Sequence, residues 1–170
     1  MGFELKTILL AMTPINELRG TIPLAIGLWQ LSPLKAFFLA VFGNMIPVFF
    51  LLWFWKHLAK YLMGKSKNIE RFFNWFFKRT RQRFYKNLPR SARKNLVTRS
   101  ARNKKQRILV DIALVLLVAI PLPFTGAWTG TAAAFLFDIP YKKSLGLIFI
   151  GIVIAGLIVT LATLGFISII

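Results

Sequence analysis

Two long apolar stretches in the sequence carry no charged side chain. Residues 36–55 form 20 such positions, and residues 144–170 form 27 more. A hydrocarbon core of about 30 Å is crossed by about 20 helical residues, so the pattern predicts transmembrane helices over 34–56 and 142–168. Trp53, Trp55 and Lys56 end the first stretch in the aromatic-then-cation order expected at a membrane interface.

Two further apolar stretches, 5–31 and 108–137, are each interrupted by a polar break, at 13–20 and 121–126. Each arm beside a break is about half as long as a bilayer-crossing helix. Backbone exposed at membrane depth must be buried in protein or line a wet cavity. We therefore predict two re-entrant helical hairpins whose tips face each other. Proline and glycine open the turns, at Pro14, Gly20 and Pro23 in the first and Pro121, Pro123 and Gly126 in the second.

The two halves of the chain repeat each other. A shift of 107 positions without gaps superposes an acid, two prolines and a lysine, namely Glu4 on Asp111, Pro14 on Pro121, Pro33 on Pro140 and Lys35 on Lys142. A hairpin returns to its own side and the following helix crosses, so the second half starts on the opposite face. The repeat is therefore expected to be inverted, as in many secondary transporters.

These patterns predict an all-α integral membrane protein built as an inverted repeat, in which each half is a re-entrant helical hairpin plus one transmembrane helix. The expected divisions are a first repeat at 1–56 (hairpin 5–31, helix 34–56), a basic loop at 57–107, and a second repeat at 108–170 (hairpin 108–137, helix 142–168). The alternative is four full spans, in which 5–29 and 108–137 each cross once. The charge asymmetry fits both, and the polar break midway along each stretch favours the hairpins.

Charge is concentrated in one segment. Residues 56–107 hold 18 of the 23 Lys and Arg and a single acid, Glu70, whereas the chain is 56% hydrophobic and only 16% charged. This composition excludes an ordinary soluble enzyme and a disordered chain. The positive-inside rule places the loop in the cytoplasm and the protein in the cytoplasmic (inner) membrane. Apolar and basic positions over 69–84 predict an interfacial amphipathic helix on anionic lipid head groups, and no nucleic acid is expected.

Ionisable and polar residues in the first break are the strongest candidates for a substrate or proton site. Glu17 and Arg19, with Asn16 beside them, fall near the predicted bilayer midplane, where charged groups normally face a cavity or a partner. Glu17 would bind a cation or a proton, and Arg19 an anionic head group or Glu17 itself. The alternatives are an internal ion pair that locks the hairpin and a tip that reaches water.

The second break offers uncharged groups. Thr125, Thr129 and the Trp128 indole face the predicted site, and the arm that starts near Ala127 presents free N–H groups suited to anions. The alternative is close helix packing through small residues, including Gly126 and Gly130.

Three further features concern packing and cofactors. Asn44 and Pro47 interrupt the first span, and Asn44 is more typical of a contact between helices than of a ligand. Small residues over 151–160 predict a packing face or a dimer seam. The chain has no Cys and no clustered metal ligands, so neither a cofactor nor a metal is expected. The sequence also contains no pairing of a nucleophile with a base, so an enzyme is not expected.

At these residues the chain resembles the small multi-drug export protein family. The matching strings are NELRGTIPLAIG (16–27), GNMIPVFF (43–50), AIPLPFTGAWTGTAAAFL (119–136) and GIVIAGLIVT (151–160). The family is similar in layout to the DedA/VTT membrane proteins, which are associated with lipid or lipid-carrier translocation. By this resemblance, the family-motif positions are Glu17, Arg19, Pro23, Asn44, Pro47, Pro121, Pro123, Gly126, Trp128 and Gly130.

Three functions fit this reading. The first is a small transporter that exports amphipathic molecules through a site between the hairpins, with proton coupling through Glu17. The second is a DedA-like flippase or scramblase for anionic lipids or lipid carriers, and the third is a membrane scaffold that transports nothing. One chain barely encloses a cavity, so a homodimer is expected.

The two topologies differ in where the chain ends. Paired hairpins put both termini outside the cytoplasm, and four spans put both inside. Two reporters can be fused to the C-terminus, one active only outside the cytoplasm and one active only inside it. We expect activity from the first and none from the second. A cytoplasmic C-terminus would contradict the inverted-repeat prediction.

Overall fold

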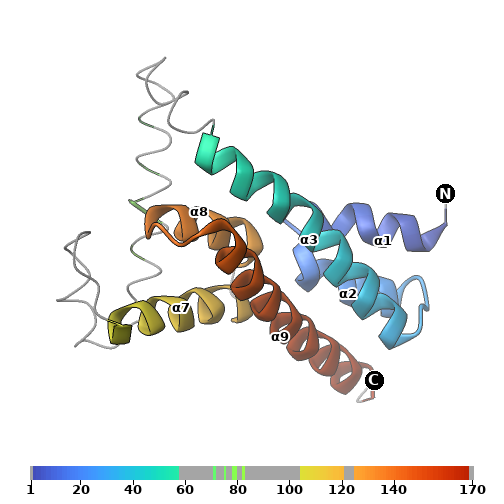
Figure 1. Cartoon of the computed structure of the whole chain (residues 1–170). Helices are drawn as coiled ribbons and strands as arrows, with labels where there is room; N and C mark the ends of the chain where they lie inside the picture. Colours follow the sequence, from blue (N-terminus) through green and yellow to red (C-terminus); the bar gives the residue numbers. More distant parts are fainter. Residues whose placement is uncertain are drawn as a thin grey trace.

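The computed structural model describes residues 2–57, 104–120 and 125–168, together with Arg71, Trp75, Lys78, Arg79 and Gln82. Within these residues the chain is helical, and each half has two short helices followed by a long one (Figure 1). The helices are α1 (Phe3–Ala11), α2 (Glu17–Gly27), α3 (Pro33–His57), α7 (Lys104–Ala119), α8 (Ala127–Leu136) and α9 (Tyr141–Ile167).

The long helices α3 and α9 are the two helices in the described part of the chain that are long and apolar enough to cross a membrane. With 25 and 27 residues they reach about 38 and 40 Å, enough to cross a bilayer core of about 30 Å with some tilt. They pack against each other in antiparallel directions. Lys56 at the end of α3 and Tyr141 at the start of α9 line one cavity. Towards the other end, a Cβ added at Gly156 of α9 would lie 2.8 Å from the Phe37 ring.

Four short helices pack around this pair. α1 and α2 contact each other and α3, and α7 and α8 contact each other and α9. The halves also exchange partners, because α2 packs against α9 and α8 packs against α3 (Figure 1). The contact between α3 and α8 includes the Trp55 indole. This indole donates a hydrogen bond to the Thr131 hydroxyl at 3.1 Å and stacks on the Phe135 ring. The ends of α1 and α7 lie near the middle of the long helices, because a Cβ added at Gly43 of α3 would lie 3.0 Å from the Ala11 Cβ, and one added at Gly151 of α9 would lie 2.6 Å from the Val118 Cβ.

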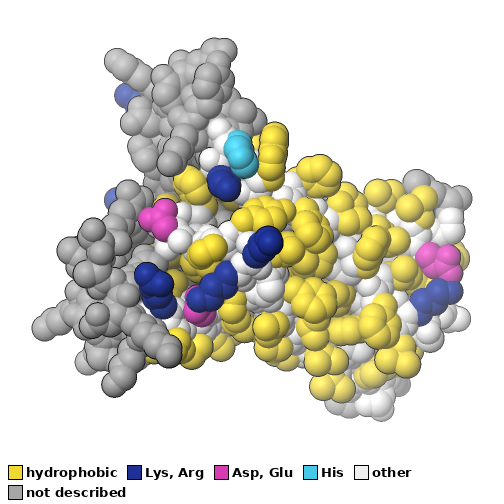
Figure 2. Space-filling model, in the orientation of Figure 1, with side chains coloured by type: hydrophobic (Ala, Val, Ile, Leu, Met, Phe, Trp, Pro, Cys, Tyr) yellow, Lys and Arg dark blue, Asp and Glu magenta, His cyan; other side chains and the backbone are white. Residues whose placement is uncertain are grey.

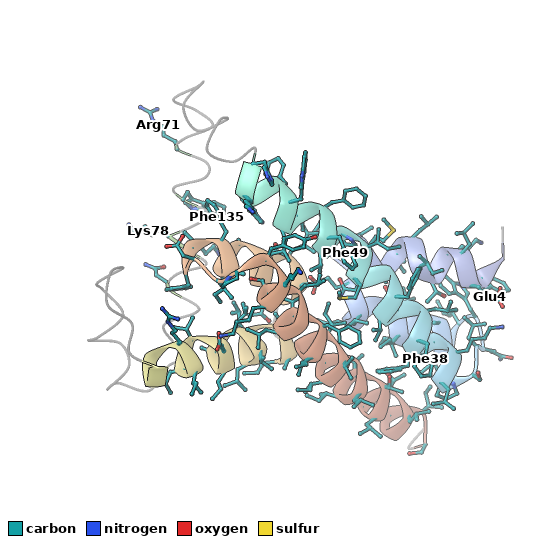
Figure 3. The ribbon with its side chains drawn as sticks, in the orientation of Figure 1. Glu4, Phe38, Phe49, Arg71, Lys78 and Phe135 are labelled. Carbon is teal, nitrogen blue, oxygen red and sulfur yellow. The ribbon has the colours of Figure 1, made fainter. Side chains whose placement is uncertain are left out.

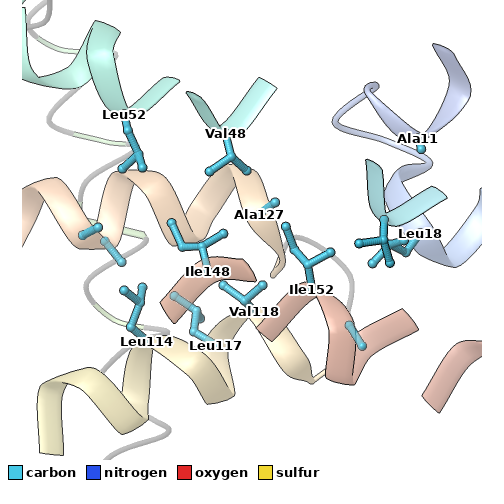
Figure 4. Close-up of a cluster of buried hydrophobic side chains, with 14 of the residues drawn as sticks. Ala11, Leu18, Val48, Leu52, Leu114, Leu117, Val118, Ala127, Ile148 and Ile152 are labelled. Atoms are coloured by element: carbon cyan, nitrogen blue, oxygen red, sulfur yellow. The ribbon is translucent and has the colours of Figure 1, made fainter. Parts of the chain in front are cut away.

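Branched aliphatic side chains fill the core between the long helices and α7. Val48 and Leu52 of α3 face Leu117 of α7 and Ile148 of α9 across the start of α8 (Figure 4). Small residues of α9 also pack inside the chain, since a Cβ added at Gly151 would lie 2.6 Å from the Cβ of Val118. The small-residue stripe is therefore a packing face within the chain.

An ion pair joins a short helix to a long one in each half. Lys35 pairs with Glu4, and Lys143 pairs with Asp111 at 2.5 Å. Both pairs tie the first short helix of a half to the first turn of its long helix. The repeated acid and lysine in the sequence thus mark equivalent contacts, although the second pair uses Lys143 rather than Lys142.

The molecule is apolar between two charged ends. In the face shown in Figure 2, hydrophobic side chains cover most of the area between a group of charged side chains at the left and a second group at the right. Glu4 lies at the opposite end of the molecule from Arg71 and Lys78, with Phe38 and Phe49 between them (Figure 3). Phe38 is 65% exposed and Phe49 is 45% exposed. A contiguous exposed apolar surface of this kind suits lipid rather than water.

Several boundaries differ from those predicted by the sequence. The first break is shorter, because α2 already begins at Glu17, and Gly20 and Pro23 lie inside this helix. Asn44 and Pro47 lie within a continuous α3 and do not interrupt it. A proline removes only one backbone hydrogen bond, which a helix packed among neighbours tolerates.

The second half follows the prediction more closely. The arms around the second break lie where the pattern placed them, but α7 begins at Lys104, inside the segment expected to be loop. Pro121 and Pro123 lie outside the described residues. So does most of the amphipathic segment 69–84, of which five residues are described, all helical and exposed.

Candidate functional site

Glu17 begins α2 with an unusual backbone conformation. Its φ is 43°, in the left-handed region that side chains with a Cβ seldom adopt, and its N–H bonds to the carbonyl of Thr13 at 3.1 Å. Backbone strain of this kind costs about 1–3 kcal/mol and is concentrated at functional sites. The side chain is buried, with 7% exposed, so this backbone conformation directs the carboxylate into the protein.

The carboxylate reaches the start of α8 in the other half. The backbone N–H of Trp128 donates to Glu17 Oε1 over 3.4 Å, and the backbone N–H of Ala127 bonds to the same carboxylate. The first N–H groups of a helix lack partners within the helix, and this end carries a partial positive charge. Glu17 therefore caps α8 across the junction between the two halves.

Gly126 gives the carboxylate its space. Its φ of 124° lies in a region that is essentially restricted to glycine. A Cβ at this position would also lie 2.8 Å from Glu17 Cδ. Both the backbone conformation of the break and the approach of the carboxylate therefore require glycine.

Arg19 makes the second connection between the breaks. Its Nη2 donates to the carbonyl of Thr125 at 2.5 Å and to the Thr125 hydroxyl oxygen at 3.0 Å, and lies 3.9 Å from Glu17 Oε2. The Thr125 hydroxyl donates in turn to the carbonyl of Ile120 at the end of α7. Arg19 thus satisfies backbone acceptors exposed by the second break and partly neutralises Glu17.

A small cavity adjoins these groups. Glu17, Arg19, Gly126 and Asn44 help to line it, and its volume of about 10 Å³ accommodates about one water molecule. Asn44 is 1% exposed, and its Oδ1 has no hydrogen-bond partner among the described residues. A buried polar atom without a partner costs about 1–3 kcal/mol, which is unusual outside functional sites.

Two other buried polar atoms near the breaks are also without partners in the part of the chain that the structure describes. They are the Thr21 hydroxyl, one turn after Glu17 in α2, and the Trp128 indole Nε1. The i, i+4 spacing of Glu17 and Thr21 is a sequence signal that points to Thr21 as a neighbour of the site. Thr21 was not among the site residues predicted from the sequence.

The site brings together some of the predicted residues and leaves others apart. Glu17, Arg19 and Thr125 are in contact, and Trp128 joins them through its backbone N–H rather than its indole. Thr129 instead donates to the carbonyl of Gly126 within its own helix end. Asn16 lies beside Gly20, where its Oδ1 would be 3.1 Å from an added Cβ.

The remaining motif residues have structural positions. Pro14 lies exposed in the first break. Gly130 lets α8 approach α7, because a Cβ there would lie 2.5 Å from Val118 Cγ2. Within the described residues no three His, Cys, Asp or Glu side chains gather as metal ligands would.

A larger cavity, which the sequence analysis did not predict, lies at the end of α3. It has a volume of about 370 Å³ and is lined by Lys56, Asp138, Tyr141 and Ser144, together with apolar side chains. The polar residues Asp138, Tyr141 and Ser144, in and after the loop between α8 and α9, are the sequence signal that could have indicated this cavity.

The fold and this site define an α-helical membrane protein in which two helix breaks meet between two long apolar helices. A family model described as "Putative small multi-drug export protein" matches residues 17–158, which is most of the chain. The chain therefore belongs to this family of membrane proteins, whose description is that of a transporter and not of an enzyme class. No curated protein and no solved structure matches the chain.

The role of Gly126 can be tested by stability. Gly126→Ala should lower the free energy of unfolding by about 1–3 kcal/mol, because alanine is strained at this φ and its Cβ meets the Glu17 carboxylate. The measurement is the unfolding midpoint of the purified protein in detergent. Gly27→Ala is the control, since a Cβ at Gly27 has no neighbour within 4 Å. Equal midpoints for the two variants would contradict the assignment.

Proposed function

We propose that the protein is a small membrane transporter that exports amphipathic molecules through the site between the two helix breaks. Glu17 and Arg19 bind the charged part of the substrate, and Thr125, Thr129 and Trp128 contact the remainder. The observation that carries the proposal is that Glu17 and Arg19, from one break, bind the backbone of the other break. Charged groups in such a position are typical of substrate and ion pathways.

The proposed architecture is an inverted repeat of two re-entrant hairpins. Its support is the antiparallel packing of α3 and α9, the equivalent ion pairs in the two halves, and the length of α1, α2 and α8, each about half that of a bilayer-crossing helix. In the cytoplasmic membrane, the basic loop then lies on the cytoplasmic side and binds anionic lipid head groups.

Movement of one half against the other would provide alternating access. Both contacts of the site cross between the halves, so either half can only move if Arg19 leaves Thr125 and Glu17 leaves the start of α8. A proton on Glu17 removes the charge that holds this carboxylate at the helix end. Proton coupling through Glu17 is therefore part of the proposal.

A second candidate is a flippase or scramblase for anionic lipids or lipid carriers. The observation that favours it is the combination of a guanidinium and a helix N-terminus, both of which bind phosphate. The substrate head group separates the two candidates, because a lipid flippase requires the phosphate and an exporter of other amphipathic molecules does not.

Transport can be measured with the full chain in lipid vesicles, using 8-anilinonaphthalene-1-sulfonate as an amphipathic probe and fluorescent phosphatidylserine as a lipid probe. Glu17→Gln and Arg19→Gln should each lower the transport rate about tenfold or more, because each removes charge-assisted hydrogen bonds within the site. Glu4→Gln and Lys35→Gln make the same chemical changes at an exposed ion pair and should leave the rate unchanged.

The two probes decide between the functions. Movement of phosphatidylserine alone supports the flippase, and movement of the anilinonaphthalenesulfonate supports the exporter. Wild-type vesicles that move neither probe faster than protein-free vesicles would contradict both and favour a scaffold.

We also propose a homodimer whose interface covers the first break. Ile15 in this break is 89% exposed beside the exposed Pro14. Irregular backbone at membrane depth is not found facing lipid, so a second copy is needed to cover it.

The absence of cysteine from the chain allows a clean test of this interface. Ile15→Cys should give a covalent dimer with a short bis-maleimide reagent in membranes. Leu161→Cys, on an exposed face of α9, is the control and should remain a monomer. A monomer from both variants would contradict an interface at this break.

A further inference from the structure

The start of α8 is an anion-binding position that a side chain of the same chain already occupies. The Glu17 carboxylate lies against the N–H groups of Ala127 and Trp128, with the Arg19 guanidinium on its other side. These groups would hold any small oxyanion equally well, because backbone N–H groups and a guanidinium recognise charge and geometry rather than the rest of the molecule. The adjacent cavity holds only about one water molecule, so a second anion has no room while Glu17 is in place.

The buried Asn44 amide is the second observation at this site. Asn44 lines the same cavity as Glu17, and its Oδ1 has no donor among the described residues. An ionised carboxylate has no proton to offer this oxygen, whereas a protonated carboxyl group has one O–H to donate. The cavity thus offers Glu17 a second position that suits only its protonated form.

From this geometry we infer that Glu17 competes internally with the substrate's anionic group for a site made by Arg19 and the start of α8. When Glu17 takes a proton from the aqueous side, its carboxyl group turns to Asn44 and leaves the N–H groups and Arg19 to an oxyanion. The ligand class is a carboxylate, sulfonate or phosphate on an amphipathic molecule. The inference rests on the proposed function, since it names the substrate class and the coupling of that same site. Because proton and anion bind together, they cross in the same direction, and the anion's own outward gradient drives the export.

Charge balance supports the exchange. Among the described residues that line the cavity, Arg19 is the only charged side chain besides Glu17. α3 contributes Asn44, and α7, α8 and α9 contribute only apolar side chains and Gly126. Ionised Glu17 with Arg19 carries no net charge. Protonated Glu17 with Arg19 and a bound monoanion is also neutral. An uncompensated buried charge is costly, so proton and anion bind together or not at all.

The left-handed backbone of Glu17 fits a residue with two positions. Its φ is 43°, and backbone conformations of this kind are concentrated at functional sites and switch regions. A purely structural cap would need no strained residue, because the short polar side chains that usually cap helices reach the first N–H groups from the helix's own chain.

The test measures binding of octanesulfonate to the full chain in lipid nanodiscs by calorimetry. This probe is anionic at every pH used, so only the protein titrates. Wild-type protein should bind it about tenfold more tightly at about pH 5 than at about pH 8, and Glu17→Gln should bind it tightly at both. Arg19→Gln should bind it weakly at both.

Three controls sharpen the result. Octyltrimethylammonium has a matched chain and the opposite charge, and should show no such dependence on pH or on Glu17. Methanesulfonate distinguishes a site for free oxyanions from one that needs the alkyl chain. Asn44→Leu removes the oxygen that would accept a hydrogen bond from protonated Glu17 and keeps a similar side-chain volume. Protonation of Glu17 then becomes less favourable, so the affinity for octanesulfonate should rise only at a lower pH than in wild type.

Two outcomes would overturn the inference. One is that folded Glu17→Gln binds octanesulfonate no better than wild type at about pH 8, which makes Glu17 a permanent cap. The other, which applies even where Glu17→Gln does not fold, is that Asn44→Leu leaves the pH dependence unchanged. Vesicles that transport a probe, together with octanesulfonate binding that does not depend on the protonation of Glu17, would reject this inference alone. Octanesulfonate binding that does depend on Glu17, together with vesicles that transport neither probe, would reject the proposed function alone.

Discussion

A buried carboxylate that caps a helix of the opposite half determines how the two halves of this protein meet. Because Glu17 must reach the first N–H groups of α8, the chain accepts a left-handed residue at the start of α2 and a glycine at position 126. Arg19 follows from the same requirement, since it balances the carboxylate and satisfies the Thr125 carbonyl beside it. Within the described residues, the ends of the two breaks thus satisfy each other's charged and polar groups.

The two halves have similar frameworks but different chemistry. Each has a short helix tied by an ion pair to the start of its long helix, and each sends its second short helix against the long helix of the other half. The charged side chains of the site, however, all come from the first half. The second half contributes backbone groups, the Thr125 hydroxyl and a glycine. The framework is repeated because both halves solve the same packing problem, and the chemistry differs because a carboxylate needs donors opposite it rather than a second carboxylate.

The sequence predicted the parts of this structure that depend on side-chain polarity. The length of the apolar stretches located α3 and α9, and the proline-rich break located the end of α7 and the start of α8. The first break was drawn too long because Asn16, Glu17 and Arg19 have the polarity of a turn, although two of them begin a helix. The contact between the breaks was expected, and so were the free N–H groups of the arm that starts near Ala127. Their ligand was not identified, because no side-chain pattern indicates that the Glu17 carboxylate of the other half occupies them. Asn44 was read as a contact between helices. More is indicated only by its place in the lining of the Glu17 cavity and by its Oδ1, which has no partner among the described residues.

In the transporter that we propose, the position of the contact couples charge to movement of the two halves. Separating the halves while Glu17 is ionised would leave a buried carboxylate without the N–H groups of α8, and an uncompensated buried charge of this kind costs about 3–5 kcal/mol. Separating them with Glu17 neutral but Arg19 unpaired would leave the opposite charge exposed to the same low-dielectric surroundings. The halves can therefore move at low cost only when both charges are matched, either by each other or by a proton and an anion. A site that is assembled from two halves, and that is neutral in just these two states, links ligand binding to relative movement without any additional element.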